Sequence, residues 1–206
     1  MALWAIVPVK PLRRGKSRLA KVISAEERAE LNQYLLEHTI QVLSTIEEIE
    51  NVLVISRDTE ALALARDLGA RTVQEYGSPG LNTALTRAVE IAKSYGTCGI
   101  LVIPADLPRL DAEDIRKILV HRKTPPVVVI APDRKKEGTN ALFACPPDLI
   151  EFKYGKRSFE KHSKAAKEAG ARLEVCDLAS LELDLDEPED LALIKEELLI
   201  NGEQIT

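Results

Sequence analysis

Apolar and polar residues form blocks along the chain that are typical of strands and helices in alternation. Short apolar runs predict strands at residues 3–9, 52–55, 100–103, 127–131 and 139–145. Short strands are also expected at 71–74 and 172–176, with a further extended piece at 181–185. Between these runs, apolar residues recur at helical spacing, as in Leu31, Leu35 and Val42. This order is typical of βαβ units, which form a mostly parallel sheet.

Polar residues mark where several helices begin. Ser24 stands three residues before a glutamate, which is a capping box, and Asp58, Asp111 and Ser158 each precede a helical pattern. Residues 132–160 break the alternation and predict an antiparallel piece with a loop over the strand ends. We therefore expect an α/β fold in a single domain spanning residues 1–206, with a mostly parallel central sheet and a small antiparallel insertion.

Composition excludes several classes of protein. With 30% charged and 45% apolar residues, the chain is typical of a soluble globular protein. Its net charge of -5 argues against nucleic-acid binding, and no apolar run approaches the roughly 20 residues of a membrane span. The amino terminus lacks the charged region of a signal peptide. Cys98, Cys145 and Cys176 have no metal-ligand spacing, so we expect free thiols and a cytoplasmic location.

The segment from Gly99 to Arg109 is the centre of the functional argument. A buried strand ends abruptly there and is followed by Asp106, which stands between two prolines. Ligands of open α/β sheets bind just beyond the carboxyl ends of the strands. Asp106 is therefore expected to hold a metal or a ligand, since Asp111 is better placed to cap the next helix.

A basic loop follows the first strand. It carries five cationic side chains between residues 10 and 18, and it includes Gly15-Lys16-Ser17, which is similar to the end of a Walker A motif. Position 10 is Lys10 rather than glycine, and no helix is predicted directly after Ser17, so we exclude a P-loop. Placed at a strand end, Lys10, Lys16 and Arg18 are expected to bind a polyphosphate, with Arg13 and Arg14 nearby.

A second acidic cluster lies near the carboxyl end of the chain. Residues two apart in an extended segment face the same side, so Asp184 and Asp186 present their carboxylates together. Asp186 has an alternative role as the cap of the following helix, whereas Asp184 has no such local role. Three carboxylates converging beside a basic loop predict a Mg²⁺ site formed by Asp106, Asp184 and Asp186.

The third group of polar residues lies in the irregular region. Thr139 offers a hydroxyl, Gly155 permits close approach of the backbone, and Ser158 at a helix start suits an anion. A helix cap alone would also explain Ser158. The three histidines, residues 38, 121 and 162, have no spacing typical of a zinc site or a triad, and we interpret them as structural or surface residues. No dinucleotide fingerprint is present.

Taken together, these motifs resemble the guanylyltransferases of coenzyme F420 biosynthesis, a family that includes the 2-phospho-L-lactate and phosphoenolpyruvate guanylyltransferases. The resemblance covers nearly the whole chain in order. It rests on Pro8-Val-Lys10, Gly15-Lys-Ser-Arg-Leu19, Gly80-Leu-Asn-Thr-Ala-Leu85, Pro104-Ala-Asp-Leu-Pro108, Gly138-Thr-Asn140, Tyr154-Gly-Lys-Arg-Ser158 and the acidic segment 184–191. Many related nucleotidyltransferases carry Gly-Gly where this chain has Pro-Val-Lys, which counts against sugar-phosphate and molybdopterin nucleotidyltransferases.

The resemblance implies a Rossmann-like nucleotidyltransferase fold of the GT-A type, with GTP and a small phosphorylated carboxylic acid as substrates. It implies two Mg²⁺ ions at the three aspartates and acceptor binding at Thr139, Gly155 and Ser158. We expect Lys16 and Asp106 to act directly in catalysis. The residues expected to bind the nucleotide are Lys10, Lys16, Ser17, Arg18 and Asn82.

The expected reaction is attack of the acceptor phosphate on the α-phosphorus of GTP with release of pyrophosphate, which needs no general base. The sequence leaves the acceptor open among phosphoenolpyruvate, 2-phospholactate and 3-phosphoglycerate. A nucleotidyltransferase that uses CTP or another acceptor, and a catalytically silent nucleotide-binding regulator, remain as alternatives. No membrane or nucleic-acid partner is expected, and the apolar side chains of the irregular region would suit a homodimer.

Overall fold

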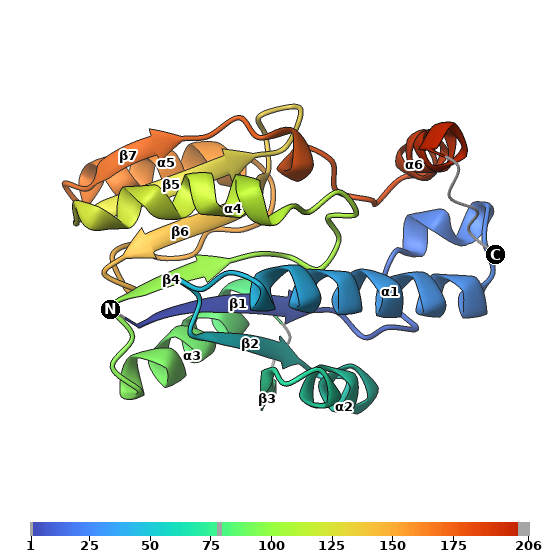
Figure 1. Cartoon of the computed structure of the whole chain (residues 1–206), viewed down its shortest axis with the longest axis horizontal. Helices are drawn as coiled ribbons and strands as arrows, with labels where there is room; N and C mark the ends of the chain where they lie inside the picture. Colours follow the sequence, from blue (N-terminus) through green and yellow to red (C-terminus); the bar gives the residue numbers. More distant parts are fainter. Residues whose placement is uncertain (1, 78–79, 202–206) are drawn as a thin grey trace.

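Seven strands form one mixed sheet at the centre of the molecule (Figure 1). The computed structural model describes residues 2–77 and 80–201, with the side chains of the last helix described as far as Ile194. The strands are β1 (Leu3–Val9), β2 (Asn51–Ser56), β3 (Arg71–Gln74), β4 (Gly99–Val102), β5 (Val127–Pro132), β6 (Thr139–Cys145) and β7 (Arg172–Val175). Their spatial order is β3-β2-β1-β4-β6-β5-β7.

The sheet is mostly parallel, as the alternation of apolar runs predicts. Only β6 runs against its neighbours, pairing antiparallel with both β4 and β5. The predicted antiparallel piece is therefore present, and it lies inside the sheet, between β4 and β5. Because β6 reverses direction there, Thr139 at its start lies at the same end of the sheet as the last residues of β4 and β5.

Helices cover both faces of the sheet. They are α1 (Ala25–Ser44), α2 (Thr59–Asp67), α3 (Leu81–Ser94), α4 (Ala112–Leu119), α5 (Ser158–Glu168) and α6 (Pro188–Asn201), with short 3-10 helices η1 (Ser17–Lys21), η2 (Val120–Lys123) and η3 (Ala179–Leu181). Helices α1, α2 and α4 pack in one apolar cluster, and α3 and α5 pack in another on the opposite face.

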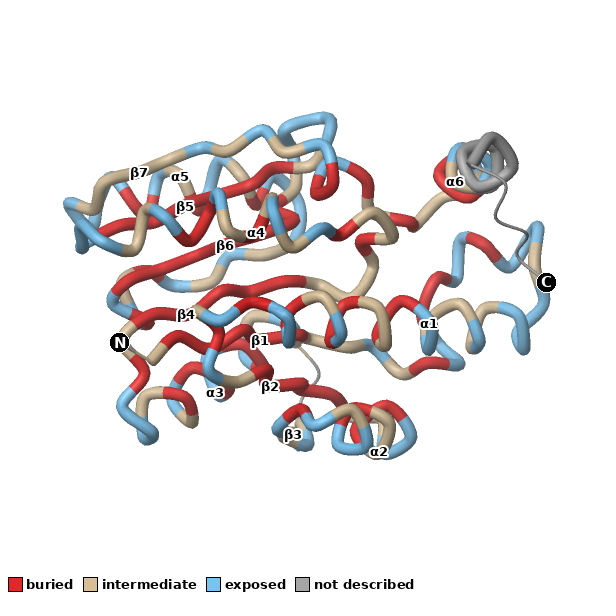
Figure 2. The backbone as a smooth tube through the Cα atoms, in the orientation of Figure 1, coloured by how far each residue is buried: buried red, intermediate tan, exposed pale blue. Residues whose placement is uncertain are grey.

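Strand periodicity explains how the two clusters form. Along β1, Leu3, Ala5 and Val7 belong to the first cluster, whereas Trp4 and Ile6 belong to the second. Both sides of β1 are therefore buried, and burial is continuous along the central strands in Figure 2. Apolar runs without alternation are expected for strands covered on both faces.

The helix starts agree with the sequence signals at three of four positions. Ser24 forms the predicted capping box, and Asp58 and Asp111 accept hydrogen bonds from backbone N–H groups two residues later. The prediction for Ser158 was wrong, because Arg157 is the capping residue of α5 and Ser158 is the first helical residue, without a capping bond from its side chain. The hydroxyl of Ser158 is thereby left for another role.

Two further expectations were wrong. The extended piece predicted at 181–185 forms no strand, since η3 ends at Leu181 and an irregular segment leads to α6. A helix does begin at Ser17, although it is only the short 3-10 helix η1, and Lys16 before it adopts the left-handed conformation with φ 52°. Helix α6 lies at the end of the molecule beside η1, where Leu19, Leu185 and Leu191 form a small third cluster (Figure 1).

The structure contains no disulfide among its described residues, and all three cysteines are free, as predicted. Within the same residues, no helix has both the length and the apolar character needed to cross a membrane.

Candidate active site

A cleft of about 660 Å³ opens at the carboxyl end of the parallel strands. Three separate segments supply the predicted cations and carboxylates of the cleft: the basic loop after β1, the turn after β4, and the irregular segment before α6. The cleft is lined by Lys10, Lys16, Arg18, Asp106, Thr139, Gly155, Ser158, Asp184 and Asp186, together with apolar and backbone groups. Nine of the eleven residues predicted for the site therefore share one cleft.

Backbone hydrogen bonds bring the two acidic segments together. The N–H of Leu185 donates to the carbonyl oxygen of Asp106 at 2.9 Å, so the segment 184–186 runs beside the end of β4. Leu183 and Leu185 are buried, whereas Asp184 and Asp186 on either side of Leu185 face the cleft. The predicted alternation holds in this segment even though it joins no strand ladder.

Lys16 lies among these carboxylates. Its side chain is only 8% exposed, and its Nζ donates a hydrogen bond to the carbonyl oxygen of Leu185. Burial lowers the pKa of the Lys16 ammonium, and the charges of Asp106 and Asp186 oppose this effect. Lys16 therefore places a positive charge where an anionic substrate would meet the carboxylates.

Burial also disfavours the charge of two of the acids. It raises the pKa of Asp106 to about 6, against the opposing effect of Lys16, and it raises the pKa of Asp184 as well. A bound cation would offset the free-energy cost of ionising these two buried carboxylates.

The donor set suits Mg²⁺ in chemistry, because all three side chains offer oxygen ligands. Within residues 2–77 and 80–201, however, no group of three or more His, Cys, Asp or Glu side chains is arranged so that it could hold a metal ion. A cation that keeps some of its water ligands and also binds substrate phosphates does not need a complete set of protein ligands. The oxygens that line this cleft fit such a cation.

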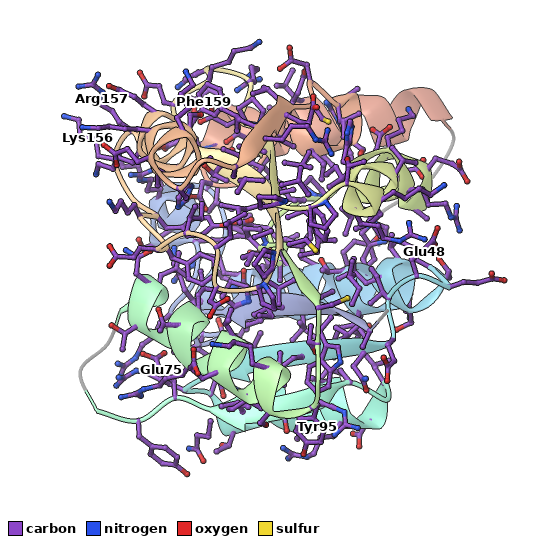
Figure 3. All side chains as sticks on the ribbon, turned by 90° about the vertical axis from the view of Figure 1, so that its left-hand side faces the viewer. Glu48, Glu75, Tyr95, Lys156, Arg157 and Phe159 are labelled. Carbon is purple, nitrogen blue, oxygen red and sulfur yellow. The ribbon has the colours of Figure 1, made fainter. Side chains whose placement is uncertain are left out.

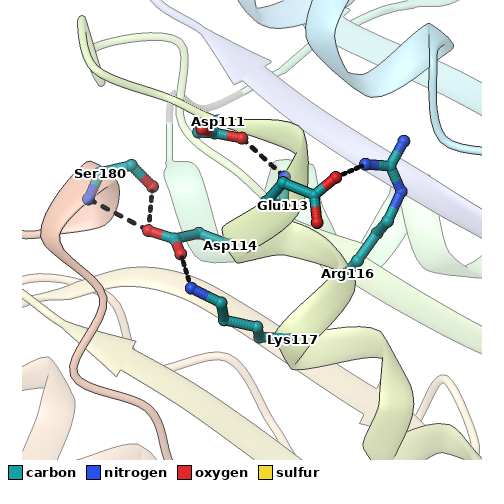
Figure 4. A network of polar contacts seen from close by, with 6 residues as sticks. All are labelled: Asp111, Glu113, Asp114, Arg116, Lys117 and Ser180. Atoms are coloured by element: carbon teal, nitrogen blue, oxygen red, sulfur yellow. Dashed lines mark hydrogen bonds and ion pairs between the residues drawn. The ribbon is translucent and has the colours of Figure 1, made fainter.

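A network of polar contacts around Asp114 holds η3, which precedes Asp184 in the chain (Figure 4). The carboxylate of Asp114 accepts hydrogen bonds from the hydroxyl and the N–H of Ser180 in η3, at 2.7 and 3.3 Å. Burial opposes ionisation of Asp114, but bonds from Lys117 and Ser180 outweigh it and lower the pKa of this carboxyl. From the other side, Nδ2 of Asn140 donates to the carbonyl oxygen of Leu181 at 2.8 Å.

Thr139 and Ser158 are a second group of polar side chains in the cleft. Both are buried, at 5% and 2% exposure, and both line the cleft with Gly155. Gly155 has φ +114°, a conformation that L side chains rarely adopt, so its backbone requires glycine. Two hydroxyls and an uncovered backbone can together bind a phosphate or a carboxylate.

His162 orients the hydroxyl of Thr139. The ring nitrogen Nε2 accepts a hydrogen bond from the N–H of Lys153 at 2.8 Å, so in a neutral imidazole the proton is on Nδ1, which lies 3.0 Å from Oγ1 of Thr139. Burial, aided by the charges of Lys153 and Lys161, lowers the pKa of His162 to about 4 and keeps the ring neutral. The Thr139 hydroxyl accepts from His162 and is free to donate its own proton toward the cleft.

The structure places several predicted residues away from the cleft wall. Ser17 is exposed outside the cleft. Asn82 directs its amide to the backbone of Tyr154, accepting from its N–H at 2.8 Å and donating to its carbonyl oxygen at 3.3 Å. It therefore fixes the turn that contains Gly155. Lys156 and Arg157 project outward in Figure 3 and do not line the cleft.

Sequence reasoning missed other cleft residues. Arg57 and Glu75 follow the ends of β2 and β3 and line the cleft, as does Tyr154. Ligands of open α/β sheets bind beyond the carboxyl ends of the strands. Applied to β2 and β3 as well as to β4, this rule would have indicated Arg57 and Glu75. The structural interpretation of His162 was confirmed, but its contact with Thr139 was not apparent from the sequence.

Comparison with known proteins agrees with this arrangement. The model of the family described as "Guanylyl transferase CofC like" matches residues 3–206. The phosphoenolpyruvate guanylyltransferase of Rubrobacter xylanophilus is 39% identical, over 95% of this chain and 94% of that protein. The 2-phospho-L-lactate guanylyltransferase of Methanocaldococcus jannaschii is 35% identical, over 96% of this chain and 82% of that protein.

Solved structures support the fold. A crystal structure described as that of a "putative nucleotide-diphospho-sugar transferase" from Desulfovibrio desulfuricans superposes with a TM-score of 0.77, over 96% of this chain and 88% of that chain. At 16% sequence identity, this likeness is evidence for the architecture alone.

Proposed function

The chain belongs to the family of CofC-like guanylyl transferases, and from this premise we propose that it transfers GMP from GTP to a small phosphorylated carboxylic acid. The acceptor is phosphoenolpyruvate or 2-phospho-L-lactate, the substrates that appear in the names of the two relatives. The reaction releases pyrophosphate and belongs to coenzyme F420 biosynthesis. The observation that carries the proposal is that carboxylates, Lys16 and two buried hydroxyls line one cleft.

The chemistry follows from these groups. An oxygen of the acceptor phosphate attacks the α-phosphorus of GTP, the bond from that phosphorus to the bridging oxygen breaks, and pyrophosphate leaves. A phosphate monoester already carries the negative charge needed for attack near neutral pH, so no side chain has to remove a proton. The chain instead aligns two polyanions and neutralises their charge.

Each wall of the cleft has a distinct role in this alignment. Lys10 and Arg18 at its mouth attract the triphosphate, and the buried ammonium of Lys16 donates to its oxygens as charge shifts toward the leaving pyrophosphate. Thr139 and Ser158 donate hydrogen bonds to the acceptor.

We also propose that Mg²⁺ binds at Asp106, Asp184 and Asp186, where it would neutralise phosphate charge and stabilise the leaving group. Asp106→Asn is expected to abolish transfer, because it removes one of the anionic oxygens that hold the cation.

Pyrophosphate release tests the proposal. The protein is incubated with Mg²⁺, each nucleoside triphosphate in turn, and each of phosphoenolpyruvate, 2-phospholactate and 3-phosphoglycerate. We expect release with GTP and one of these acids, equal in amount to the GMP adduct, and none with Asp106→Asn. No release with GTP and any of the three acids would refute the proposal. Release only with CTP would assign the site to a different nucleotidyltransferase reaction.

A further inference from the structure

Two charged side chains meet at the ends of β2 and β3, in a part of the cleft that the reacting groups leave unused. Ser56 and Gln74 are aligned in the parallel register, so the next residues, Arg57 and Glu75, lie side by side beyond the strand ends. The N–H of Glu75 donates to the carbonyl oxygen of Ser56 at 2.8 Å and fixes this alignment. Glu75 lies in the neighbourhood of α3 in Figure 3.

The carboxylate of Glu75 is oriented by one of its two oxygens. Oε1 accepts from the guanidinium of Arg57 and from the N–H of Gly80, each at 3.3 Å. Within residues 2–77 and 80–201, Oε2 has no hydrogen-bond partner. The side chain is only 12% exposed and lines the cleft, so one carboxylate oxygen is held in place and the other is open to a ligand.

Arg57 adds a second indication of a ligand. Its Nη2 donates to Oε1 of Glu75 and to the carbonyl oxygen of Gly77. Its Nε is buried and has no partner among the described residues. Apolar side chains line the same cleft: Ile55 and Ala84 are buried, and Leu81 is 42% exposed. Polar groups between apolar walls are typical of a site for a planar heterocycle.

We propose that Glu75 selects the guanine base of the nucleotide, with Arg57 as the positioning residue that holds its carboxylate. The inference rests on the proposed use of GTP and identifies the group that distinguishes it from other nucleotides. Oε2 of Glu75 accepts from N1–H of guanine, and the 2-amino group donates to the same carboxylate.

The chemistry of the bases restricts this arrangement to guanine. Guanine presents two neighbouring donors, N1–H and the 2-amino group, to one carboxylate. Adenine and cytosine each place an unprotonated ring nitrogen beside their amino group, and this nitrogen would repel the carboxylate. Uracil has a single N–H between two carbonyl oxygens. A mostly buried carboxylate therefore favours guanine and disfavours the other three.

Equilibrium binding of GTP and ITP tests the inference without an acceptor. Inosine lacks only the 2-amino group, so ITP removes one hydrogen bond to the carboxylate. Calorimetric titration in the presence of Mg²⁺ should give a dissociation constant for GTP about tenfold to a hundredfold lower than for ITP. Glu75→Gln keeps the shape of the side chain. Since Arg57 and Gly80 are donors, the amide oxygen stays with them and the amide NH2 faces the base.

In Glu75→Gln we therefore expect the dissociation constants for GTP and ITP to differ by no more than about threefold. The control variant Glu90→Gln, on the exposed face of α3, should keep the wild-type preference for GTP. A circular dichroism spectrum and an unfolding temperature equal to those of the wild type establish that the variant folds. Equal binding of GTP and ITP by the wild type, or an unchanged preference in Glu75→Gln, would overturn the assignment of Glu75. Failure of the proposed transferase function appears separately, as a lack of pyrophosphate release by a protein that binds GTP.

Discussion

Replacement of Asp106 by asparagine should stabilise the fold of the metal-free protein while it removes activity. Burial raises the pKa of Asp106 from 3.8 to about 6 in the folded state. At 1.36 kcal/mol per pKa unit, the ionised carboxylate lowers the free energy of unfolding by about 3 kcal/mol above pH 7. Asparagine has nearly the same shape and carries no charge, so Asp106→Asn should recover most of this free energy.

The sign of the pH dependence follows from proton linkage. Between pH 3.8 and about 6 the folded protein binds more protons at Asp106 than the unfolded chain does. The contribution of this group to the free energy of unfolding is therefore fully present below pH 3.8, and it is lost as the pH rises through about 6. The asparagine does not titrate. The difference in stability between Asp106→Asn and wild type should therefore grow with pH, from near zero at pH 4 to its maximum above pH 7.

Urea unfolding in EDTA, followed by circular dichroism from pH 4 to pH 8, measures this difference. Asp67→Asn, at an exposed position in α2, serves as the control and should change stability by less than about 0.5 kcal/mol at every pH. Added Mg²⁺ should stabilise the wild type and leave Asp106→Asn almost unchanged. No gain at pH 8, or an equal gain at all pH values, would refute the assignment of a buried and costly charge to Asp106.

Three further predictions concern the walls of the cleft. Lys16→Met should lower kcat for GMP transfer by about a hundredfold to a thousandfold, whereas Lys21→Met on the exposed side of η1 should not; equal rates would refute the role of Lys16. His162→Gln removes the ring N–H that donates to Thr139, so the KM for the acceptor should rise about fivefold while the KM for GTP stays unchanged. His162→Asn should restore the acceptor KM in part. A parallel rise in both KM values would contradict this role of His162. Asp114→Asn should weaken Mg²⁺ activation severalfold by loosening the segment before α6, and an unchanged Mg²⁺ titration would argue against that coupling.

Local sequence signals predicted much of the fold because they act over a few residues. The bounds of β1 and β6 agree with the predicted apolar runs, since a strand buried on both faces requires continuous apolar side chains. The bounds of the short edge strand β3 also agree with the prediction. Caps at Ser24, Asp58 and Asp111 likewise depend only on neighbours two or three residues away. Ser158 was mistaken for a cap because its residue type suits that role, while the left-handed backbone of Arg157 has no sequence signal.

The candidate site was predictable where its residues follow strands. Asp106 lies beyond the end of β4, and the alternation of Leu183 and Leu185 with the two aspartates placed both carboxylates on one side. This alternation reflects burial of leucine, and it persists without a strand ladder because burial does not require one.

The sequence by itself therefore determined the alternation of strands and helices, most helix starts, and the residue types that face the cleft, because each depends on short-range periodicity and hydrogen bonding. Only the tertiary structure decided that β6 lies between β4 and β5, that His162 orients Thr139, and that Glu75 meets Arg57. Arg57 and Glu75 are 18 positions apart, and Thr139 and His162 are 23 positions apart. The place of β6 depends on the order of strands in the sheet. Local propensity does not encode such contacts, since they arise from the packing of the whole chain.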